Sequence, residues 1–558
     1  MDFFPAEAVR FYHPSEEKKM LSLPEIILSR DDVALVGTGS LSCIRALYIS
    51  ARDFGKAHQF FPCITPAEEY ATGENGLRLE ACLNRVLKVP GVGGIIVYAS
   101  CMDVLNQTDF ETVFSHLDNA ENIPVEVLYR GPMAKRYMKP TEQLKEIFSS
   151  MPETGKKISP AYEALPPIGP DFNCISSALQ YMDSYPFLIT PGGCAGGVEE
   201  FGAADKKYLL KNSRLSDVQV SLGCEKAIKN CIAEDYHDTY SGSSSSKRRT
   251  LACLMGSAVP AFTGMDCDSI ANELTDSGVP AVYLPSDGFT PGSAGFSKAM
   301  LALCRAKVRK STEKDAGRIN ILGYCSALLG REDKLAHGIE HLNRLGLTCT
   351  VWGRGDIEHT SEACLNWVVS AAGLQLAKLM KNEFGIPYIS GIPVGEHAVL
   401  SWQEQIKKLV NAGNEDFSFC EPSEPFTTEK QPKILIIHEP MLMGSIRSFF
   451  KEELGYTDVT LAVYAPLPNL RKFYGSVCGD LPLRYFSSAE ELLELGAGAN
   501  YVIADPVYGK YFTGSAFIPL PDPQISGEQY LDMPYEIFGK KGAAYLSGEI
   551  KKHKGETL

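Results

Sequence analysis

Three cysteines of this 558-residue sequence stand in turns that follow short apolar runs. Cys43 closes the turn Gly37-Thr38-Gly39-Ser40-Leu41-Ser42, Cys101 follows Ser100, and Cys194 follows Pro191-Gly192-Gly193. The apolar runs are typical of buried strands, so each thiol is expected at the end of a strand. Glycine beside a cysteine lets the backbone approach a bound group and donate N–H groups to sulfur. These residues favour a buried metal cluster with thiolate ligands.

The thiol-bearing turns belong to an internal repeat. In each copy an apolar run leads to a Gly-rich turn with a cysteine, and a second run leads to a loop that begins with serine. The runs are residues 33–36 and 94–98 in the first copy, and residues 187–190 and 251–255 in the second. Residues 100–113 can be laid on residues 257–270 without a gap, which sets Ala258 against Cys101, although Cys253 lies a few residues upstream.

The elements that position these turns alternate along the chain. Short β-branched runs alternate with amphipathic stretches, which is the pattern of parallel sheets covered by helices. In such sheets ligands bind at the carboxyl ends of the strands, so the loops with Cys43, Cys101, Cys194 and Cys349 form the expected functional edge. We expect an α/β fold of several Rossmann-like parallel-sheet domains around a central cleft.

Four domains are predicted, within the range of roughly three to five that a chain of this length suits. They cover residues 1–150 with Cys43 and Cys101, 151–312 with Cys174 and Cys194, 313–415 with Cys349, and 430–558. A Pro-rich segment at 139–170 and an acidic segment at 414–431 are predicted linkers, and the Ser-rich segment 241–249 is a predicted mobile loop.

Composition excludes several classes of protein. The net charge of -14 argues against a non-specific nucleic-acid binder, because phosphate contacts need a basic surface. No apolar stretch approaches the ~20 residues of a membrane span, and residues 1–5 do not resemble the start of an export signal. A cytoplasmic location is therefore expected. In that compartment the 16 cysteines of the chain are expected to be mostly free thiols. Many would be small buried hydrophobes, such as Cys82, Cys231, Cys304 and Cys364.

Several other motifs favour an ordinary structural role. His337, Glu340 and His341 match the H-x-x-E-H zinc pattern, but they fall in an amphipathic helix expected at residues 332–345. Ser42 replaces the third glycine of a dinucleotide fingerprint, and no CxxC pair is present to suggest a zinc ribbon. Asp103 is either a loop cap or a proton donor, and capping is favoured.

Longer segments resemble the nitrogenase component 1 family of oxidoreductases. Residues 173–179 with 188–194 resemble the paired cysteine segment that binds the P-cluster in that family, and residues 37–43 and 100–102 resemble its other cysteine loops. Residues 345–356 resemble the segment whose cysteine binds the active-site metallocluster, and residues 383–388 and 438–440 resemble segments that follow it. The resemblance covers most of the chain.

The resemblance implies particular ligands. Cys43, Cys101, Cys174 and Cys194 would bind an iron-sulfur cluster, either [4Fe-4S] or P-cluster-like. Cys349 would bind a second metallocluster, although a plain core thiol remains an alternative because Leu347 and Val351 flank it at strand spacing.

The sequence also departs from the family. Residues 517–523 resemble its closing strand, but no histidine follows before His553, so the second protein ligand of the nitrogenase cofactor is missing. Residues 286–293 resemble the loop beside that cofactor without the Gln and His of true nitrogenases. Dinitrogen reduction is therefore not expected.

Three functions are considered from the sequence, and the first is the expected one. It is a redox enzyme that passes electrons from a separate ATP-dependent iron-sulfur reductase to a substrate or second metallocluster, since the chain has no P-loop of its own. The second is a scaffold on which a metallocluster is assembled and handed on. The third is a cluster-free α/β binding protein. A homo-oligomer or a related subunit is the expected assembly, without nucleic acid or membrane partners.

Overall fold

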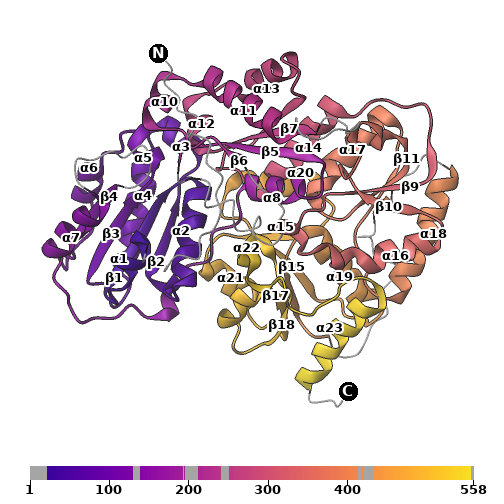
Figure 1. The fold of residues 1–558 in the computed structure, drawn as a ribbon. Coiled ribbons are helices and arrows are strands. Elements are labelled where there is room, and N and C mark those ends of the chain that lie inside the picture. Colours follow the sequence, from indigo (N-terminus) through magenta and orange to yellow (C-terminus); the bar gives the residue numbers. More distant parts are fainter. Residues whose placement is uncertain are drawn as a thin grey trace. The chain divides into compact units, whose positions relative to one another are not determined.

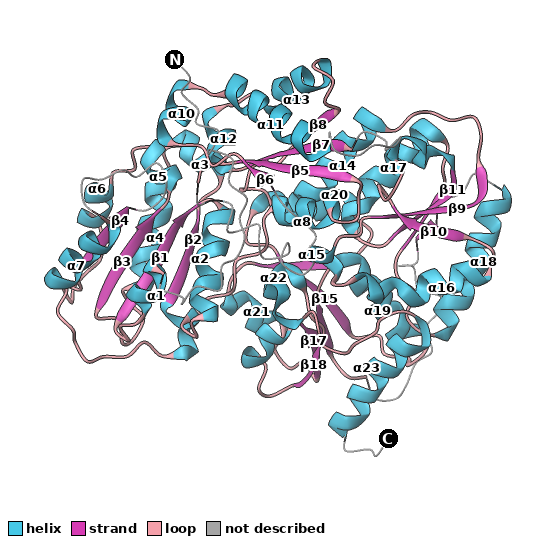
Figure 2. Cartoon of the chain, viewed as in Figure 1, coloured by secondary structure: helices cyan, strands magenta, loops and turns pink. Residues whose placement is uncertain are grey.

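The computed structural model describes residues 22–129, 139–192, 194, 211–240, 250–412, 417–418 and 431–554. Within these residues the chain forms four sheets with helices packed against them (Figures 1 and 2). This arrangement confirms the predicted α/β class with several parallel sheets. The predicted loop at 241–249 and most of the acidic segment at 414–431 lie outside the described residues.

The first sheet has the strand order β2-β1-β3-β4, and its strands are parallel. The strands are β1 Val33–Gly39, β2 Phe60–Ile64, β3 Gly94–Ala99 and β4 Val125–Tyr129. The helices are α1 Leu23–Leu28, α2 Leu41–Asp53, α3 Ala67–Thr72, α4 Asn75–Val86, α5 Cys101–Leu105, α6 Phe110–Ser115 and α7 Pro140–Ser150, with 3₁₀ turns at Ala57–Gln59 and Pro160–Tyr162.

Strand β1 is buried along its whole length. Leu35 packs into one apolar cluster with residues of α1, α2 and α7, and Val36 packs into another with residues of α4 and α6. Because successive side chains point to opposite faces and both faces are covered, every position of the strand favours an apolar residue. This explains the continuous apolar run that precedes the turn with Cys43.

The predicted linker at 139–170 is wrong in its first part, because residues Pro140–Ser150 form helix α7. Pro140 stands in the first turn, where its missing N–H costs nothing. Leu144 and Ile147 then lie one helical turn apart and are buried in the core of the first sheet. The prolines around this segment obscure that apolar spacing in the sequence.

The second sheet has the order β6-β5-β7-β8, which repeats the order of the first. Its strands are β5 Ser184–Ile189, β6 Lys211–Asn212, β7 Leu251–Gly256 and β8 Ala281–Leu284. The helices are α10 Asp217–Leu222, α11 Glu225–Tyr240, α12 Ala258–Thr263 and α13 Cys267–Asp276. Helix α8 Asp171–Leu179 precedes β5 in the chain, and its residues from Asn173 onward belong to the other compact unit described below.

The internal repeat is present in three dimensions. Ser100 after β3 precedes α5, and Ser257 after β7 precedes α12. Two aspartates then start the next helices in the same way: Asp109 accepts a hydrogen bond from Thr112 N, at 3.0 Å, and Asp266 accepts one from Ser269 N, at 2.8 Å. The gapless alignment of residues 100–113 with 257–270 is therefore a structural equivalence.

The third sheet has the order β10-β9-β11-β12-β13, and the fourth has the order β16-β15-β14-β17-β18. The third contains β9 Asp315–Leu322, β10 Thr348–Val351, β11 Ala363–Val368, β12 Tyr388–Ser390 and β13 Phe417–Ser418, with α14 Gly292–Lys307, α15 Ser326–Leu329, α16 Ala336–Arg344, α17 Leu374–Phe384 and α18 Glu396–Ala412.

The fourth sheet contains β14 Ile434–Ile437, β15 Val459–Tyr464, β16 Leu483–Phe486, β17 Tyr501–Ala504 and β18 Ala516–Pro519, with α19 Pro440–Glu452, α20 Pro468–Val477, α21 Ala489–Leu495, α22 Pro523–Ser526 and α23 Gly539–Lys554. Further 3₁₀ turns lie at Glu332–Leu335, Ile357–Glu362, Ala371–Gly373, Pro506–Tyr511 and Gly527–Tyr530.

The chain divides into two compact units. Unit 1 comprises Met1–Phe172 and Tyr185–Thr290, and unit 2 comprises Asn173–Ser184 and Pro291–Leu558. Unit 1 therefore holds the two repeated sheets, and unit 2 holds the third and fourth. The four predicted domain boundaries stay a prediction.

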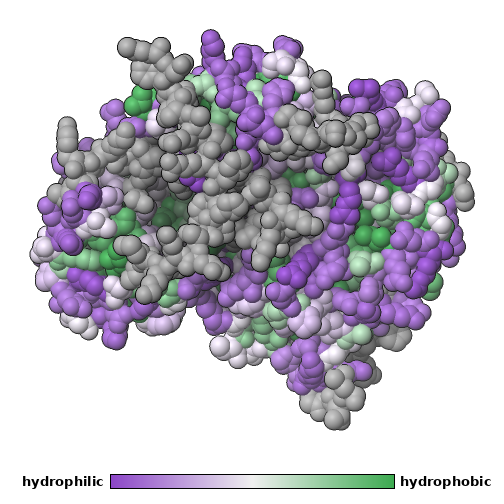
Figure 3. Space-filling model, viewed as in Figure 1, coloured by the Kyte–Doolittle hydropathy of each residue, from purple (hydrophilic) through white to green (hydrophobic). Residues whose placement is uncertain are grey.

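On the face drawn in Figure 3 the coloured residues are mostly hydrophilic, with smaller hydrophobic areas among them. None of the described helices is both long and apolar enough to cross a membrane.

Candidate metal centre

Three of the predicted ligands lie just beyond the carboxyl ends of central strands in unit 1. Cys43 is in the first turn of α2, which follows β1. Cys101 is the first residue of α5, which follows β3. Cys194 follows β5 of the second sheet. The repeat thus delivers thiols from both of its sheets to equivalent strand ends.

The three thiols interact with one another. The thiol of Cys194 is hydrogen-bonded to Cys101, and this bond together with burial raises the pKa of Cys194 well above its ordinary value. The charges of Cys43 and Cys101 act in the same direction on the pKa of Cys194. Burial raises the pKa of Cys43 to about 11, against the opposing effect of a hydrogen bond with Ser40. Without a cation the thiols of Cys43 and Cys194 stay protonated, and a bound metal would have to displace their protons.

Two glycines allow the chain to approach closely around Cys43. A Cβ atom on Gly39 would lie 2.6 Å from Ser100 Oγ, so only glycine lets the turns before Cys43 and Cys101 meet. Gly288 has φ +68°, and a Cβ there would lie 2.7 Å from Ser42 Oγ. We name Cys43, Cys101 and Cys194, with these surrounding turns, the three-thiol site.

The donor set of the three-thiol site fits an iron-sulfur cluster. Soft thiolates from separate loops are the ligands such a cluster prefers. Among the described residues, no three His, Cys, Asp or Glu side chains converge as ligands of a single metal ion. Cluster ligands differ from such a group, because each thiolate binds a different iron.

Asp103 is buried beside the three-thiol site. Its carboxylate accepts hydrogen bonds from Ser100 N and Ser100 Oγ, both at 2.8 Å, and from Tyr70 Oη at 3.0 Å. Burial raises the pKa of Asp103 in spite of these donors. The bond from Ser100 N shows that Asp103 caps the start of α5, as the sequence favoured.

A loop from the second sheet supports the turn with Cys43. Ser42 N donates a hydrogen bond to Gly288 O, at 2.9 Å. The loop is held in turn by the buried carboxylate of Asp171, which accepts from Asp287 N at 2.6 Å and Gly288 N at 3.0 Å. Burial, and then the charge of Asp287, raise the pKa of Asp171 well above its ordinary value. Sequence reasoning did not select Asp171, because a buried carboxylate carries no local sequence signal.

Cys174, the fourth predicted ligand, is a buried residue of α8 that belongs to unit 2. Its Sγ accepts a hydrogen bond from Gln524 Nε2, at 3.1 Å. A Cβ on Gly292 would lie 2.5 Å from the same sulfur and 2.4 Å from Gln524 Oε1. The role of Cys174 as a ligand remains a prediction.

Cys349 lies inside strand β10, two residues before its end, rather than in the loop where the sequence placed it. Burial, and then the charge of Cys364, raise the pKa of Cys349 to about 12. Among the described residues, the buried Cys325 is a thiol that does lie at the carboxyl edge of the third sheet, since it follows β9 and precedes α15. The signal was present: an apolar run, then Gly323, and a cysteine directly before a serine.

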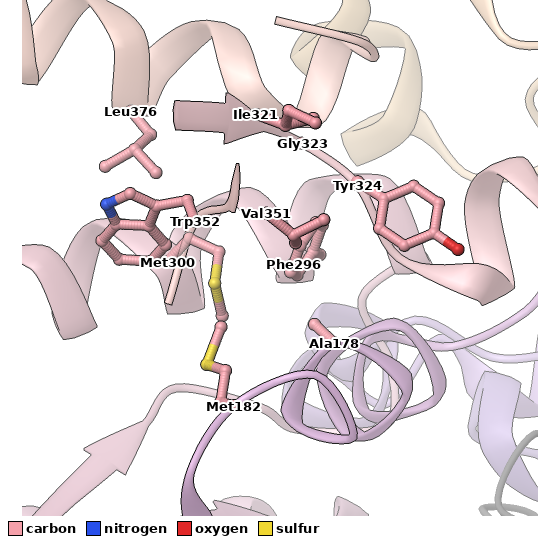
Figure 4. A pocket seen from close by; sticks show the side chains of 10 residues that line it. All are labelled: Ala178, Met182, Phe296, Met300, Ile321, Gly323, Tyr324, Val351, Trp352 and Leu376. Atoms are coloured by element: carbon pink, nitrogen blue, oxygen red, sulfur yellow. The ribbon is translucent and has the colours of Figure 1, made fainter. Parts of the chain in front are cut away.

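A small apolar pocket lies at the ends of β9 and β10 in unit 2 (Figure 4). Met182 and Met300 extend toward one another across it. The other lining residues are Ala178, Phe296, Ile321, Gly323, Tyr324, Val351, Trp352 and Leu376. Trp352 Nε1 donates to Thr360 Oγ1 at 3.1 Å, and Tyr324 Oη donates to Gly330 O at 3.1 Å. Because the polar atoms of Trp352 and Tyr324 already have hydrogen-bond partners, the pocket resembles a packing feature more than a binding site.

The H-x-x-E-H motif has structural contacts. His337 Nε2 lies 3.2 Å from Glu536 Oε2, and the ring of His341 lies 6.4 Å from that of Trp402. Helix α16 buries Gly338 and Leu342, as expected for an amphipathic helix. These contacts favour the structural role over the zinc pattern.

The fold and site define a multi-sheet α/β protein with thiols gathered at strand ends. Residues 173–469 match the family model of nitrogenase component 1 type oxidoreductases, and the chain belongs to that family. The family match includes Cys194 but not Cys43 and Cys101.

Similar proteins agree with this assignment. The chain is 25% identical over 271 residues to the nitrogenase iron-molybdenum cofactor biosynthesis protein NifE of Clostridium pasteurianum, which covers 45% of this chain and 55% of that protein. The chain thus spans about half the length of that curated relative. A structure of nitrogenase Cp1 at pH 6.5 has a TM-score of 0.52 at 12% identity, covering 69% of this chain and 92% of that one. At this identity the structural likeness shows the fold alone.

Proposed function

We propose that this chain is an iron-sulfur oxidoreductase of the nitrogenase-like type that relays single electrons. The observation that carries the proposal is the three-thiol site, where Cys43, Cys101 and Cys194 come together from two repeated sheets. When bound, an iron-sulfur cluster supplies a one-electron redox centre. The chain would hold the cluster through these thiolates, with Cys174 as the predicted fourth ligand.

Other residues of the site would tune and protect the cluster. Gly39 and Gly288 keep the turns close together, because a Cβ at either position would collide with a neighbouring serine. Asp103 holds the start of α5 and thereby the orientation of Cys101. Burial and backbone N–H donors tune the potential of a bound cluster.

The partners of this reaction are part of the proposal. The electron donor would be a separate ATP-dependent iron-sulfur reductase, and the assembly a homo-oligomer or a complex with a related subunit, located in the cytoplasm. The proposal includes a second metallocluster bound through Cys349, a thiol that lies within the edge strand β10. Removing the thiol by Cys349→Ala, with metal analysis, tests it.

A metallocluster assembly scaffold is the second candidate function. The similarity to a protein named for iron-molybdenum cofactor biosynthesis favours it. An enzyme would reduce its substrate repeatedly with the reductase, whereas a scaffold would lose its cluster to an acceptor protein. Single-turnover experiments with isotopically labelled iron separate the two, because only a scaffold transfers the label.

The first experiment is an iron, acid-labile sulfide and EPR analysis of anaerobically purified protein. About four irons per site are expected, with a strong loss after Ala substitution of Cys43, Cys101 or Cys194. Cys364→Ala is a matched control, since this thiol donates to Ala316 O and Arg318 O and lies in the third sheet. Folded protein without iron or sulfide after reconstitution would rule out both cluster functions.

A further inference from the structure

Two further cysteines of unit 1 form a pair outside the three-thiol site. Cys63 lies in β2, the edge strand of the first sheet, and Cys82 lies in α4. Helix α4 packs against β2, and both cysteines belong to the same apolar cluster. The sequence predicts only a buried hydrophobe at Cys82, because the fold alone brings it to Cys63. Neither cysteine falls within the residues that match the family model.

The two thiols are hydrogen-bonded to each other. The Cys63 thiol donates to the sulfur of Cys82, and this bond raises the pKa of Cys63 well above its ordinary value and lowers the pKa of Cys82. Burial opposes the lowering at Cys82 but does not outweigh it. Cys82 is therefore the thiol of the pair that ionises first, while Cys63 keeps its proton.

Two arginines of α4 stabilise the ionised form of Cys82. The charge of the exposed Arg85 and a hydrogen bond from its guanidinium lower the pKa of Cys82 further, and the charge of Arg78 acts less strongly in the same direction. Arg78 is already paired with Glu69, which explains its smaller influence. A thiolate that lies beside a cation and next to a second thiol is typical of a reactive cysteine.

Burial limits which oxidants can react with the pair. Cys63 is 3% exposed and Cys82 is 4% exposed, so a bulky disulfide or a partner protein has no access to the sulfurs. Ala81 and Arg85 are exposed on the same helix, so the sulfur of Cys82 lies directly beneath the surface. Side-chain rotamer motion is enough to admit a small uncharged molecule to such a position. The class of oxidant that fits is a small hydroperoxide.

We propose that Cys63 and Cys82 are a redox-active dithiol that hydrogen peroxide oxidises to a disulfide. The Cys82 thiolate attacks one peroxide oxygen and becomes a sulfenic acid, the O–O bond breaks, and the hydroxide that leaves takes up the proton that Cys82 released. The sulfur of Cys63 then attacks the sulfenic sulfur, the S–O bond breaks, and the hydroxide leaves as water with the Cys63 proton. The two thiols lose two electrons and two protons in total, and the peroxide is reduced to two water molecules.

This inference goes beyond the proposed function and is independent of it. The cysteines concerned are not among the predicted cluster ligands, and the chemistry needs no bound iron. Iron analysis and disulfide mapping therefore succeed or fail separately.

Peptide mapping of the full chain by mass spectrometry tests the proposal. The reduced protein is treated briefly with hydrogen peroxide, catalase stops the reaction, and the remaining thiols are alkylated. We expect the peptides with Cys63 and Cys82 to be joined, with the mass of two hydrogen atoms lost, and to separate after treatment with dithiothreitol. Cys304 is the internal control, because burial raises its pKa to about 12, and it should stay reduced. A pair that is oxidised no faster than Cys304 would overturn the proposal.

Serine variants assign the two roles. Cys63→Ser should leave Cys82 as a sulfenic acid, which dimedone traps for mass spectrometry. Cys82→Ser should leave Cys63 unmodified, because the thiol that keeps its proton is a poor nucleophile. Dimedone labelling of Cys63 rather than Cys82 would show that the attacking thiol is wrongly assigned.

A surface substitution tests the electrostatic part without altering the apolar cluster. Arg85→Ala removes the guanidinium beside Cys82 and should slow disulfide formation about threefold to tenfold. Lys88→Ala is the matched control, because it removes an equal charge from an exposed position just after α4, and the rate should change by less than about twofold. Equal rates in the two variants would contradict the role of Arg85 in activating Cys82.

Discussion

Ser42 donates its backbone N–H to the carbonyl oxygen of Gly288, at 2.9 Å, and this bond ties the Cys43 turn of the first sheet to a loop of the second. Because Gly288 has φ +68° and no space for a Cβ, the junction depends on glycine. The two halves of the three-thiol site are thus joined by backbone as well as by thiols.

Gly288→Ala should therefore weaken unit 1. The substitution imposes the cost of a positive φ, about 1 kcal/mol, and a collision with Ser42 Oγ, for a total loss of about 2–3 kcal/mol in the free energy of unfolding. Gly264→Ala is the control, because Gly264 has φ +71° and no atom within 4 Å of a Cβ. Urea unfolding measures both, and equal losses would show that no close contact exists at Gly288.

Tyr70→Phe should destabilise the capped start of α5. The Tyr70 hydroxyl donates to the buried Asp103 carboxylate at 3.0 Å, and its removal leaves that acceptor with one donor fewer. The expected loss is about 1–2 kcal/mol. Thr72→Ala, which removes an exposed hydroxyl two residues away, should change stability by less than about 0.5 kcal/mol. Similar values for the two variants would argue against the Tyr70 contact.

Gly292→Ala should disturb the surroundings of Cys174 in unit 2. The new methyl group would lie within 2.5 Å of Cys174 Sγ and of Gln524 Oε1, so the side chains must shift at a cost of about 1–3 kcal/mol. Gly514→Ala, where a Cβ meets no atom within 4 Å, should be nearly neutral. Thermal unfolding compares them, and an unchanged Tm for Gly292→Ala would contradict the close packing.

Glu439 should make the stability of unit 2 depend on pH. Burial raises its pKa from 4.5 to about 7, although its carboxylate accepts from Ala371 N at 2.6 Å and Leu442 N at 2.9 Å. Between these two pKa values the folded state binds more protons than the unfolded state. The contribution of Glu439 to the free energy of unfolding therefore falls by about 3 kcal/mol as the pH rises from about 4.5 to 7.

Urea unfolding at pH 5 and pH 7 measures this dependence. The side chain of the Glu439→Gln variant cannot titrate. This variant should therefore lose less stability between pH 5 and pH 7 than the unmodified protein does. The exposed Glu490→Gln on α21 serves as the control and should follow the unmodified protein. Parallel changes in all three proteins would show that Glu439 is already ionised at pH 5.

Local patterns of the sequence were enough to determine the α/β class and the placement of Cys43, Cys101 and Cys194 after strands. Buried parallel strands need continuous apolar runs, and the turns after them need glycine or a capping serine, so both features are written in neighbouring residues. The same reasoning missed helix α7, where prolines hid the spacing of Leu144 and Ile147.

Only the tertiary structure decided which thiols meet. Cys43, Cys101 and Cys194 interact because two sheets of the same strand order present their carboxyl ends to one site, whereas Cys174 meets Gln524, 350 positions away along the chain. Leu347 and Val351 flank Cys349 at strand spacing, and the pairing of β10 with β9 places this cysteine within the strand rather than in the loop. Such contacts depend on how whole sheets pack, and the spacing of neighbouring residues carries no record of that packing.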